Sequence, residues 1–245
     1  MGIKNKKIGV IFFHKNIRSI YNPNWIDKCI KSIINQTVNN FKIYEINYGG
    51  DNYRLFEGDK DKHYFKNIEL DNHALAMNMI IDEAFNDGCD YVFNTNLDDY
   101  YHPTRIEKQI EKLESGYDIV SSDFCYVEEI DSIDQITHYK NIKSNTDIVK
   151  NLAFNHNVIA HPVVAYSKKF WEKNRYNGEE IPMEDLMLWK RAIANGFNFY
   201  IHDDVLLYYR LHSNQITGNN SSKNNPSNFD KNDNQSSLRN LIYHI

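Results

Sequence analysis

The first half of the chain alternates between apolar runs that suit strands and amphipathic stretches that suit helices, and this order restricts the fold most. Strand patterns lie near residues 6–16, 41–48 and 90–96, and helical patterns lie near residues 25–36, 74–88 and 103–116. A repeated strand–helix order is typical of a mostly parallel sheet with helices on both faces. The sequence therefore predicts an α/β fold.

The second half is more mixed. Strand patterns lie near residues 117–127, 158–167, 197–201 and 205–211, and helical patterns lie near residues 146–154 and 184–196. The last two strand patterns predict paired strands, with Asp203 and Asp204 in the turn between them. After Leu211 the sequence becomes almost wholly polar, which predicts a flexible loop over 212–236 and a terminal helix over 237–245. No stretch has the composition of a linker, so we expect one domain over 1–245.

Composition narrows the classes of function. The chain has 245 residues, 41% of them hydrophobic, which is enough for one large core. Its net charge of −5 gives no basic surface for nucleic acid, so we expect no nucleic-acid partner. Three widely spaced cysteines (Cys29, Cys89 and Cys125) suit a reducing compartment and small buried positions. We find no transmembrane run and no signal-peptide pattern, so the sequence predicts a cytoplasmic protein.

Two adjacent carboxylates, Asp98 and Asp99, follow the third strand pattern in the stretch NTNLDDYYHP. Most such pairs are solvated turns, and that interpretation stays open on the residues alone. In an open α/β sheet, however, ligands bind at the carboxyl ends of strands, and carboxylate oxygens there suit Mg²⁺ or Mn²⁺. The sequence contains no GxxxxGK[ST], no GxGxxG and no spacing of zinc ligands.

Four segments in order resemble the family-2 glycosyltransferases, inverting enzymes of the GT-A fold. They are KSIINQT, MNMIIDEAFNDGCDYVFNTNLDD, EDLMLWKRAIANGFNF and YYRLHSNQIT. The resemblance runs from Ile8 to about Thr217. It implies a Rossmann-like, mostly parallel central sheet flanked by helices, with a smaller mixed or antiparallel part on the acceptor side. The nucleotide-binding half would cover about 1–100, and the acceptor and catalytic half about 101–211.

The resemblance assigns the metal region to Asn96, Leu97 and Asp98, with Asp99 following. Asp98 takes the position that holds Mn²⁺ or Mg²⁺ against the donor diphosphate. Asn96 stands where the family has an aspartate near the ribose, and Leu97 lies between the two. Asp99 is either a supporting partner or a solvated neighbour.

Residues elsewhere in the chain complete the predicted donor site. Arg210 is expected to stabilise the diphosphate, and His212 is expected to complete the metal shell. The alternative is that Arg210 forms a structural ion pair and His212 is a surface residue, and both interpretations stay open. Asn47 and Tyr48 stand in the turn whose carboxylate reads uracil in the family, with Asp51 displaced from it. The other two expected donor contacts are Phe13, where the family usually has proline, and Asn78.

Glu184 and Asp185 begin the helical pattern near 184–196. The resemblance places Asp185 at the catalytic base, which removes a proton from the acceptor hydroxyl, and makes Glu184 its neighbour in the catalytic site. The alternative is that both carboxylates only cap the helix. Among the aromatic residues, Tyr100, Tyr101 and Trp171 are candidates for sugar stacking, whereas the spacing of Trp189 favours the core.

Together these observations predict a metal-dependent inverting glycosyltransferase. It would transfer a sugar from a nucleotide-diphosphate sugar, a UDP-sugar first, to a hydroxyl of a carbohydrate or other acceptor. A homo-oligomer is possible. Two alternatives stay open: a non-catalytic protein that binds nucleotide sugars or glycans on the same fold, and, more weakly, a nucleotidyltransferase.

Overall fold

The computed structural model describes residues 6–57, 59–130, 133–139 and 145–212. Internal contacts divide the chain into two units, Met1–Leu211 and His212–Ile245. The division falls where the composition turns polar. Of the predicted 212–236 loop only His212 is described, and the predicted 237–245 helix lies outside the described residues.

The first half forms a parallel sheet in the order β3-β2-β1-β4. The strands are β1 (Ile8–His14), β2 (Lys42–Asn47), β3 (His63–Asn67) and β4 (Tyr91–Thr95). Because the strands are parallel, their carboxyl ends lie at one edge, where His14 pairs with Asn47 and Phe12 pairs with Thr95. Residues that follow β1, β2 and β4 therefore meet at this edge.

The sheet continues from β4 through β8, β6, β9 and β5, with β7 paired to β6. These strands are β5 (Tyr100–Tyr101), β6 (Ile119–Ile130), β7 (Ile133–Tyr139), β8 (Ala165–Ser167) and β9 (Phe199–Arg210). β8 is antiparallel to β4 and β6, whereas β6 and β9 are parallel. The predicted α/β fold, a parallel half followed by a mixed half, is confirmed.

Two strand predictions are wrong. The strand expected near 158–167 is limited to Ala165–Ser167, because His161–Val163 forms a 3₁₀ turn. The paired strands expected near 197–201 and 205–211 are a single strand, β9, and Asp203 and Asp204 lie within it. Both residues are exposed, beside a register irregularity between β9 and β6 at Asp123. Polar side chains at exposed positions of a strand look like a turn in the sequence, although the backbone stays extended.

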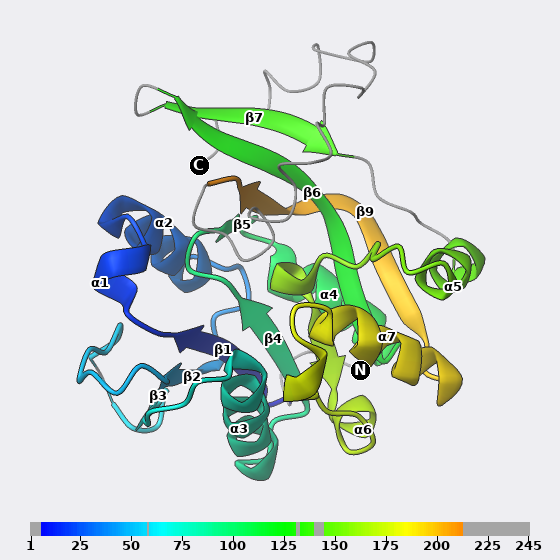
Figure 1. Cartoon of the computed structure of the whole chain (residues 1–245), viewed down its shortest axis with the longest axis horizontal. Helices are drawn as coiled ribbons and strands as arrows, with labels where there is room; N and C mark the ends of the chain where they lie inside the picture. Colours follow the sequence, from blue (N-terminus) through cyan, green and yellow to red (C-terminus); the bar gives the residue numbers. More distant parts are fainter. Residues whose placement is uncertain (1–5, 58, 131–132, 140–144, 213–245) are drawn as a thin grey trace. The chain divides into compact units, whose positions relative to one another are not determined.

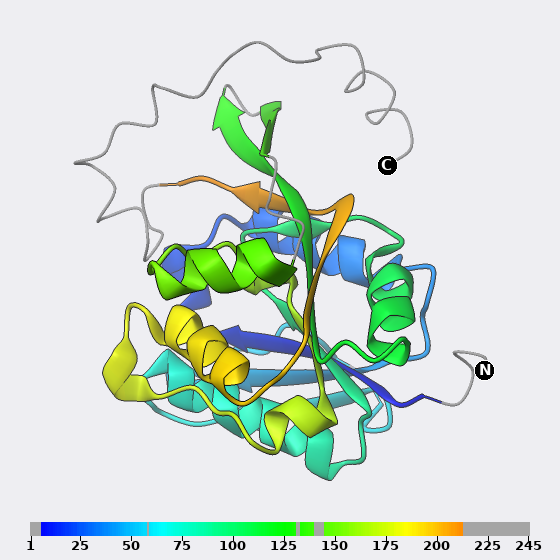
Figure 2. The same ribbon diagram turned by 90° about the vertical axis from the view of Figure 1, so that its right-hand side faces the viewer.

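Helices cover both faces of the sheet (Figures 1 and 2). One core cluster contains residues of α3 (His73–Asn86), α5 (Asn145–Ala153), α6 (Lys168–Trp171) and α7 (Glu184–Ala194). The other contains residues of α1 (Ile17–Ile20), α2 (Pro23–Ile34) and α4 (Arg105–Glu114). Two short 3₁₀ turns, η2 (His161–Val163) and η3 (Gly178–Glu180), complete the described elements. Asn22 and Asn72 cap α2 and α3. The Asn22 side chain accepts from the amide of Asn24, and the Asn72 side chain accepts from the amides of Ala74 and Leu75.

The three cysteines are free and buried, as predicted. The aromatic candidates for sugar stacking are buried as well: Tyr100, Tyr101 and Trp171 are at most 3% exposed. Tyr100 stacks on Tyr208 with ring centroids 4.5 Å apart. These rings belong to the core, and the prediction of sugar platforms was wrong, while the prediction of Trp189 as a core residue is confirmed. No helix among the described residues combines the length and the hydropathy of a membrane span.

Candidate active site

The backbone of the segment after β4 is hydrogen-bonded to two neighbouring side chains. The amide N–H of Asn96 donates to the Tyr101 hydroxyl at 2.8 Å, and the Cys29 thiol donates to the Asn96 carbonyl at 3.2 Å. Leu97 is buried and Asp98 is half-buried. The short turn therefore buries Leu97 in the core and leaves the Asp98 side chain partly accessible at the carboxyl edge of the sheet.

Asp99 is a buried structural carboxyl with one free oxygen. It is 1% exposed, so its interpretation as a solvated neighbour was wrong. Its Oδ1 accepts from the Arg210 amide at 2.8 Å, and its buried Oδ2 has no hydrogen-bond partner in the described part of the chain. Burial, and then the neighbouring Asp98 charge, raise the pKa of Asp99 well above its ordinary range against the lowering effect of Arg210.

The oxygens of this turn suit a divalent cation. The side-chain oxygen of Asn96, like Oδ2 of Asp99, is buried and unpartnered among the described atoms. Together with the Asp98 carboxylate these are the hard oxygen ligands that Mg²⁺ and Mn²⁺ prefer. No group of three His, Cys, Asp or Glu side chains that could hold a metal alone occurs within residues 6–57, 59–130, 133–139 and 145–212. A cation here would therefore take part of its shell from phosphate oxygens and water.

Arg210 ends β9 and connects this turn to the β6–β7 hairpin. Its Nε donates to the Asp98 carbonyl at 3.0 Å, and its Nη1 donates to Asp134 at 2.8 Å. Asp134 on β7 also accepts from Lys28 of α2 at 2.6 Å, and the Arg210 guanidinium lies 4.9 Å from the Trp25 ring. These contacts favour the structural interpretation of Arg210, as a residue that holds the Asp98 backbone, and its contact with the diphosphate stays a prediction.

We expect Asp134→Ala to lower the free energy of unfolding by about 2–3 kcal/mol, because it removes the carboxylate that lies 2.8 Å from the buried Arg210 guanidinium. The matched control is Asp204→Ala, which removes a surface pair with Lys108 and should cost less than about 1 kcal/mol. Denaturant unfolding of both variants measures the difference. Equal losses would mean that the Asp134–Arg210 pair is no more important than a surface ion pair.

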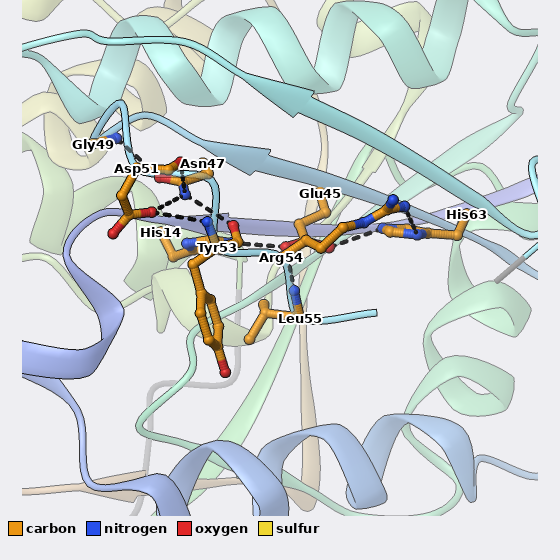
Figure 3. A network of polar contacts seen from close by, with 9 residues as sticks. All are labelled: His14, Glu45, Asn47, Gly49, Asp51, Tyr53, Arg54, Leu55 and His63. Atoms are coloured by element: carbon orange, nitrogen blue, oxygen red, sulfur yellow. Dashed lines mark hydrogen bonds and ion pairs between the residues drawn. The ribbon is translucent and has the colours of Figure 1, made fainter. Parts of the chain in front are cut away.

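The turn after β2 is organised by Asn47, which is fully buried. Its Nδ2 donates to the backbone carbonyls of Asp51 at 2.8 Å and Tyr53 at 2.9 Å, and also to the Asp51 carboxylate (Figure 3). Its Oδ1 accepts from the Gly49 amide at 3.0 Å. The amide of Asn47 is thus used within the turn, and it holds the exposed Asp51 beside the end of β2.

Tyr48 and Asp98 share a neighbour that the sequence analysis missed. Burial raises the pKa of Tyr21, and the charge of Asp98 is the next cause, followed by Tyr48. The Tyr21 hydroxyl therefore lies within electrostatic reach of both residues. Tyr21, which follows α1, is thus an electrostatic neighbour of both the predicted nucleotide turn and the predicted metal turn.

Phe13 and Asn78 have structural contacts. Phe13 is half-buried and packs against the core cluster on the α3 side of the sheet. The Asn78 side chain donates to the Tyr176 carbonyl at 2.9 Å and accepts from the Tyr176 amide at 3.0 Å. Asn78 therefore holds the backbone before η3, and donor contacts by Phe13 and Asn78 stay predictions.

The two carboxylates at the start of α7 have different surroundings. Asp185 is half-buried, and its Oδ2 accepts from the Asn157 side chain at 2.6 Å. Glu184 Oε1 is 2.7 Å from Nε2 of His73, the first residue of α3. Burial raises the pKa of Glu184, but the contact with His73, a bond from its own backbone amide and the charge of His161 together outweigh burial and leave the pKa below its ordinary value. Glu184 thus joins α7 to α3, whereas Asp185 is bonded to the segment before η2.

His161 connects the end of β4 to this helix. Its Nε2 lies 3.3 Å from the amide nitrogen of Asn94, which is in β4, and 2.8 Å from the Tyr176 hydroxyl. Burial lowers the pKa of His161, against opposing contributions from Asp185 and Glu184. The His161 ring also lies 6.4 Å from the ring of Trp189, so η2 links the end of β4 to α7. A lone histidine in AHPVV gave no sign of this role.

His212 is the last described residue and belongs to the second unit. Its assignment to the metal shell stays a prediction. A separate cavity of about 690 Å³ lies at the amino ends of β1 and β2, with Lys6, Asn39 and Lys62 among its lining residues. It is at the opposite edge of the sheet from Asp98, so it is not the site that the motifs predict.

A parallel β3-β2-β1-β4 half, a mixed second half and polar turns at their shared edge define the class of GT-A glycosyltransferase folds. The family model described as glycosyl transferase family 2 matches residues 17–175, more than half of the chain. The chain belongs to glycosyl transferase family 2.

Known proteins agree with this assignment. An uncharacterized glycosyltransferase of Methanocaldococcus jannaschii is 27% identical over 196 residues, which cover 76% of this chain and 66% of the relative. The structure of S. aureus TarS residues 1–349 in complex with UDP superposes with a TM-score of 0.60 at 14% identity, covering 84% of this chain and 61% of that 1–349 chain. The mannosyltransferase PcManGT of Pyrobaculum calidifontis, in complex with GDP-Man and Mn²⁺, has a TM-score of 0.56 at 13% identity, covering 82% of this chain and 56% of its own. The chain thus spans about two thirds of these relatives or less.

Proposed function

We propose that this chain is a metal-dependent inverting glycosyltransferase that uses a nucleoside-diphosphate sugar, with a UDP-sugar as the first candidate donor. The acceptor is a hydroxyl group of a carbohydrate or another molecule. The observation that supports the proposal is a link from β4, which leads to Asp98, to α7, which carries Asp185. Asn94 of β4 contacts His161 of η2, and the His161 ring lies 6.4 Å from the ring of Trp189 in α7. Family membership favours this function over the non-catalytic binding protein.

Asp98 would hold Mn²⁺ or Mg²⁺ together with the donor diphosphate, and the unpartnered oxygens of Asn96 and Asp99 lie beside it in the same turn. When bound, the cation neutralises the charge that develops on the leaving diphosphate. Mn²⁺ in the PcManGT complex supports the choice of metal. Arg210 fixes the Asp98 carbonyl, so the carboxylate is presented from a held backbone.

Asp185 would remove the proton from the acceptor hydroxyl as its oxygen attacks the anomeric carbon on the face opposite the diphosphate. Attack from that face inverts the anomeric configuration. The bond from Asn157 orients one carboxylate oxygen, and the position at the start of α7 favours a negative charge. Glu184, bonded to His73, would hold the helix start in place rather than take the proton.

The turn after β2 supports a uridine donor more strongly than the sequence did. The resemblance implies that a carboxylate at this turn reads uracil, and Asp51 was displaced from the expected position. Asn47 holds the Asp51 carboxylate beside the end of β2, so a carboxylate is present there after all. UDP in the TarS complex is consistent with this choice. The GDP-Man in the PcManGT complex makes guanosine the competing base.

A thermal-shift screen of UDP-, GDP-, dTDP- and CMP-sugars, each with and without Mn²⁺, tests the donor and the metal together. We expect a uridine donor to raise the melting temperature more with Mn²⁺ than without it, because the diphosphate and Asp98 share the cation. Asp51→Asn should weaken binding of that donor and leave binding of Mn²⁺ unchanged. Stabilisation by a guanosine donor alone would contradict the uridine assignment.

The cytoplasmic location and the homo-oligomer stay predictions. The metal role of His212 and the closure of the polar 212–236 segment over the donor stay predictions from the sequence as well. Because the chain spans only part of its relatives, the acceptor and the activity of the whole protein are likewise part of this proposal.

A further inference from the structure

A charged side chain lies in the middle of the parallel sheet, where apolar residues surround it. Glu45 is the fourth residue of β2 and is fully buried. Its neighbours on the same strand face include Ile43, and Phe12 lies beside it on β1. A buried carboxylate without partners is very costly, so the groups around Glu45 must supply hydrogen bonds.

Three donors satisfy this carboxylate (Figure 3). Oε1 is 2.8 Å from His14 Nε2 and accepts from the Leu55 amide at 2.6 Å, while Oε2 is 2.9 Å from His63 Nε2. Burial raises the pKa of Glu45, but the bonds from His14, His63 and Leu55 outweigh it and leave the pKa below its ordinary value. An ionised carboxylate only accepts, so both imidazoles donate to it.

Two of the loop residues after β2 depend on this arrangement. Leu55 donates its backbone N–H directly to Glu45. Arg54 Nη2 lies 3.3 Å from His63 Nδ1, and because arginine only donates, this contact leaves the Nε2 hydrogen of His63 for Glu45. The same loop, residues 48–57, carries Tyr48, Asp51 and Tyr53 around the end of β2.

We propose that Glu45 is a positioning residue for donor binding: with His14 and His63 it anchors the 48–57 loop, so that Tyr48 and Asp51 are held where the nucleotide binds. This inference rests on the proposed function for the position of the donor. Glu45 itself is fully buried, so it acts through Leu55 and not by contact with the nucleotide.

The chemistry of a carboxylate is specifically required. A glutamine at position 45 has one accepting and one donating group, whereas Leu55, His14 and His63 present three donors. His14 can reverse its tautomer, since its Nδ1 has no partner among the described residues. The Leu55 group is a backbone N–H and can only donate. His63 can reverse its tautomer only if it loses its contact with Arg54. Glu45→Gln therefore loses one loop contact, and Glu45→Met loses every acceptor.

Hydrogen exchange of the nucleotide-free protein measures the anchoring, and steady-state kinetics measures its effect on the donor. We expect the Leu55 amide to exchange about 10-fold faster in Glu45→Met and less so in Glu45→Gln. The donor KM should rise about 10-fold in Glu45→Met while kcat changes less than about 3-fold. The control is Tyr44→Phe, the adjacent residue on the opposite face, whose hydroxyl bonds to Asp87. It should change neither quantity.

Unchanged exchange at Leu55 in both Glu45 variants would overturn the proposal, and so would the same KM increase in Tyr44→Phe. Faster exchange with an unchanged donor KM would also overturn the proposal, because Glu45 would then anchor the loop without positioning the donor. If the wild type turns over no nucleotide sugar and binds none, the proposed function fails, and the inference about donor binding fails with it. The exchange data would then still show whether Glu45 anchors the loop.

Discussion

Asp98→Asn should reduce the release of nucleoside diphosphate on the order of 1,000-fold or more, at any Mn²⁺ concentration up to the millimolar range. Asparagine keeps the shape of the side chain and removes the charge that would hold the cation. The fold should be preserved, because the Asp98 backbone carbonyl that Arg210 bonds to is unchanged in this variant. A steady-state assay with and without Mn²⁺ measures the loss.

The matched control is Asp203→Asn, which removes one carboxylate from the other Asp–Asp pair. Asp203 is exposed on β9 and takes no part in the proposed site. Its activity should stay within about 2-fold of the wild type, as expected for an exposed substitution outside the site. Full activity of Asp98→Asn, with the same response to EDTA as the wild type, would remove Asp98 from the metal site.

Asp185→Asn should lower kcat about 100- to 10,000-fold, the range typical of a lost general base. Donor binding, read from the thermal shift with UDP and Mn²⁺, should stay unchanged because the base contacts the acceptor and not the nucleotide. The amide can still bond to Asn157, so the start of α7 should keep its structure.

Glu184→Gln separates the two neighbouring carboxylates. It weakens the contact with His73 and should lower the melting temperature more than Asp185→Asn does, while costing less activity. The reverse order, with a larger loss of kcat in Glu184→Gln at equal stability, would make Glu184 the base. Equal small losses in both variants would favour the interpretation of these residues as helix caps alone.

The sequence predicted the order of elements because long apolar periods do not depend on distant contacts. Helices α2, α3, α4 and α7 and strands β1, β2 and β4 lie where their patterns indicated. It missed β3, whose sequence HYFKN is partly exposed at the edge of the sheet and has little apolar pattern. It also divided β9 at two exposed aspartates. Edge strands and exposed strand positions tolerate polar residues, so periodicity fails there.

The candidate site was predicted where chain order alone sets the position, as for Asp98 after β4 and Asp185 at the start of α7. It was not predicted where the role comes from a contact between distant segments. Asp51 lies beside the end of β2 because the Asn47 side-chain amide bonds to its carboxylate. His161 contacts Asn94, which is 67 residues away in the sequence. Glu45 looked like an ordinary strand residue, and only the packing of His14, His63 and Leu55 around it shows its role.

The most direct measurement of the central claim is release of nucleoside diphosphate from a panel of nucleotide sugars by the purified protein, first with Mn²⁺ and then with EDTA. We predict release from at least one donor, its loss with EDTA and its return when Mn²⁺ is added in excess. Tight binding of a nucleotide sugar without release from any donor, or release that EDTA leaves unchanged, would contradict a metal-dependent glycosyltransferase.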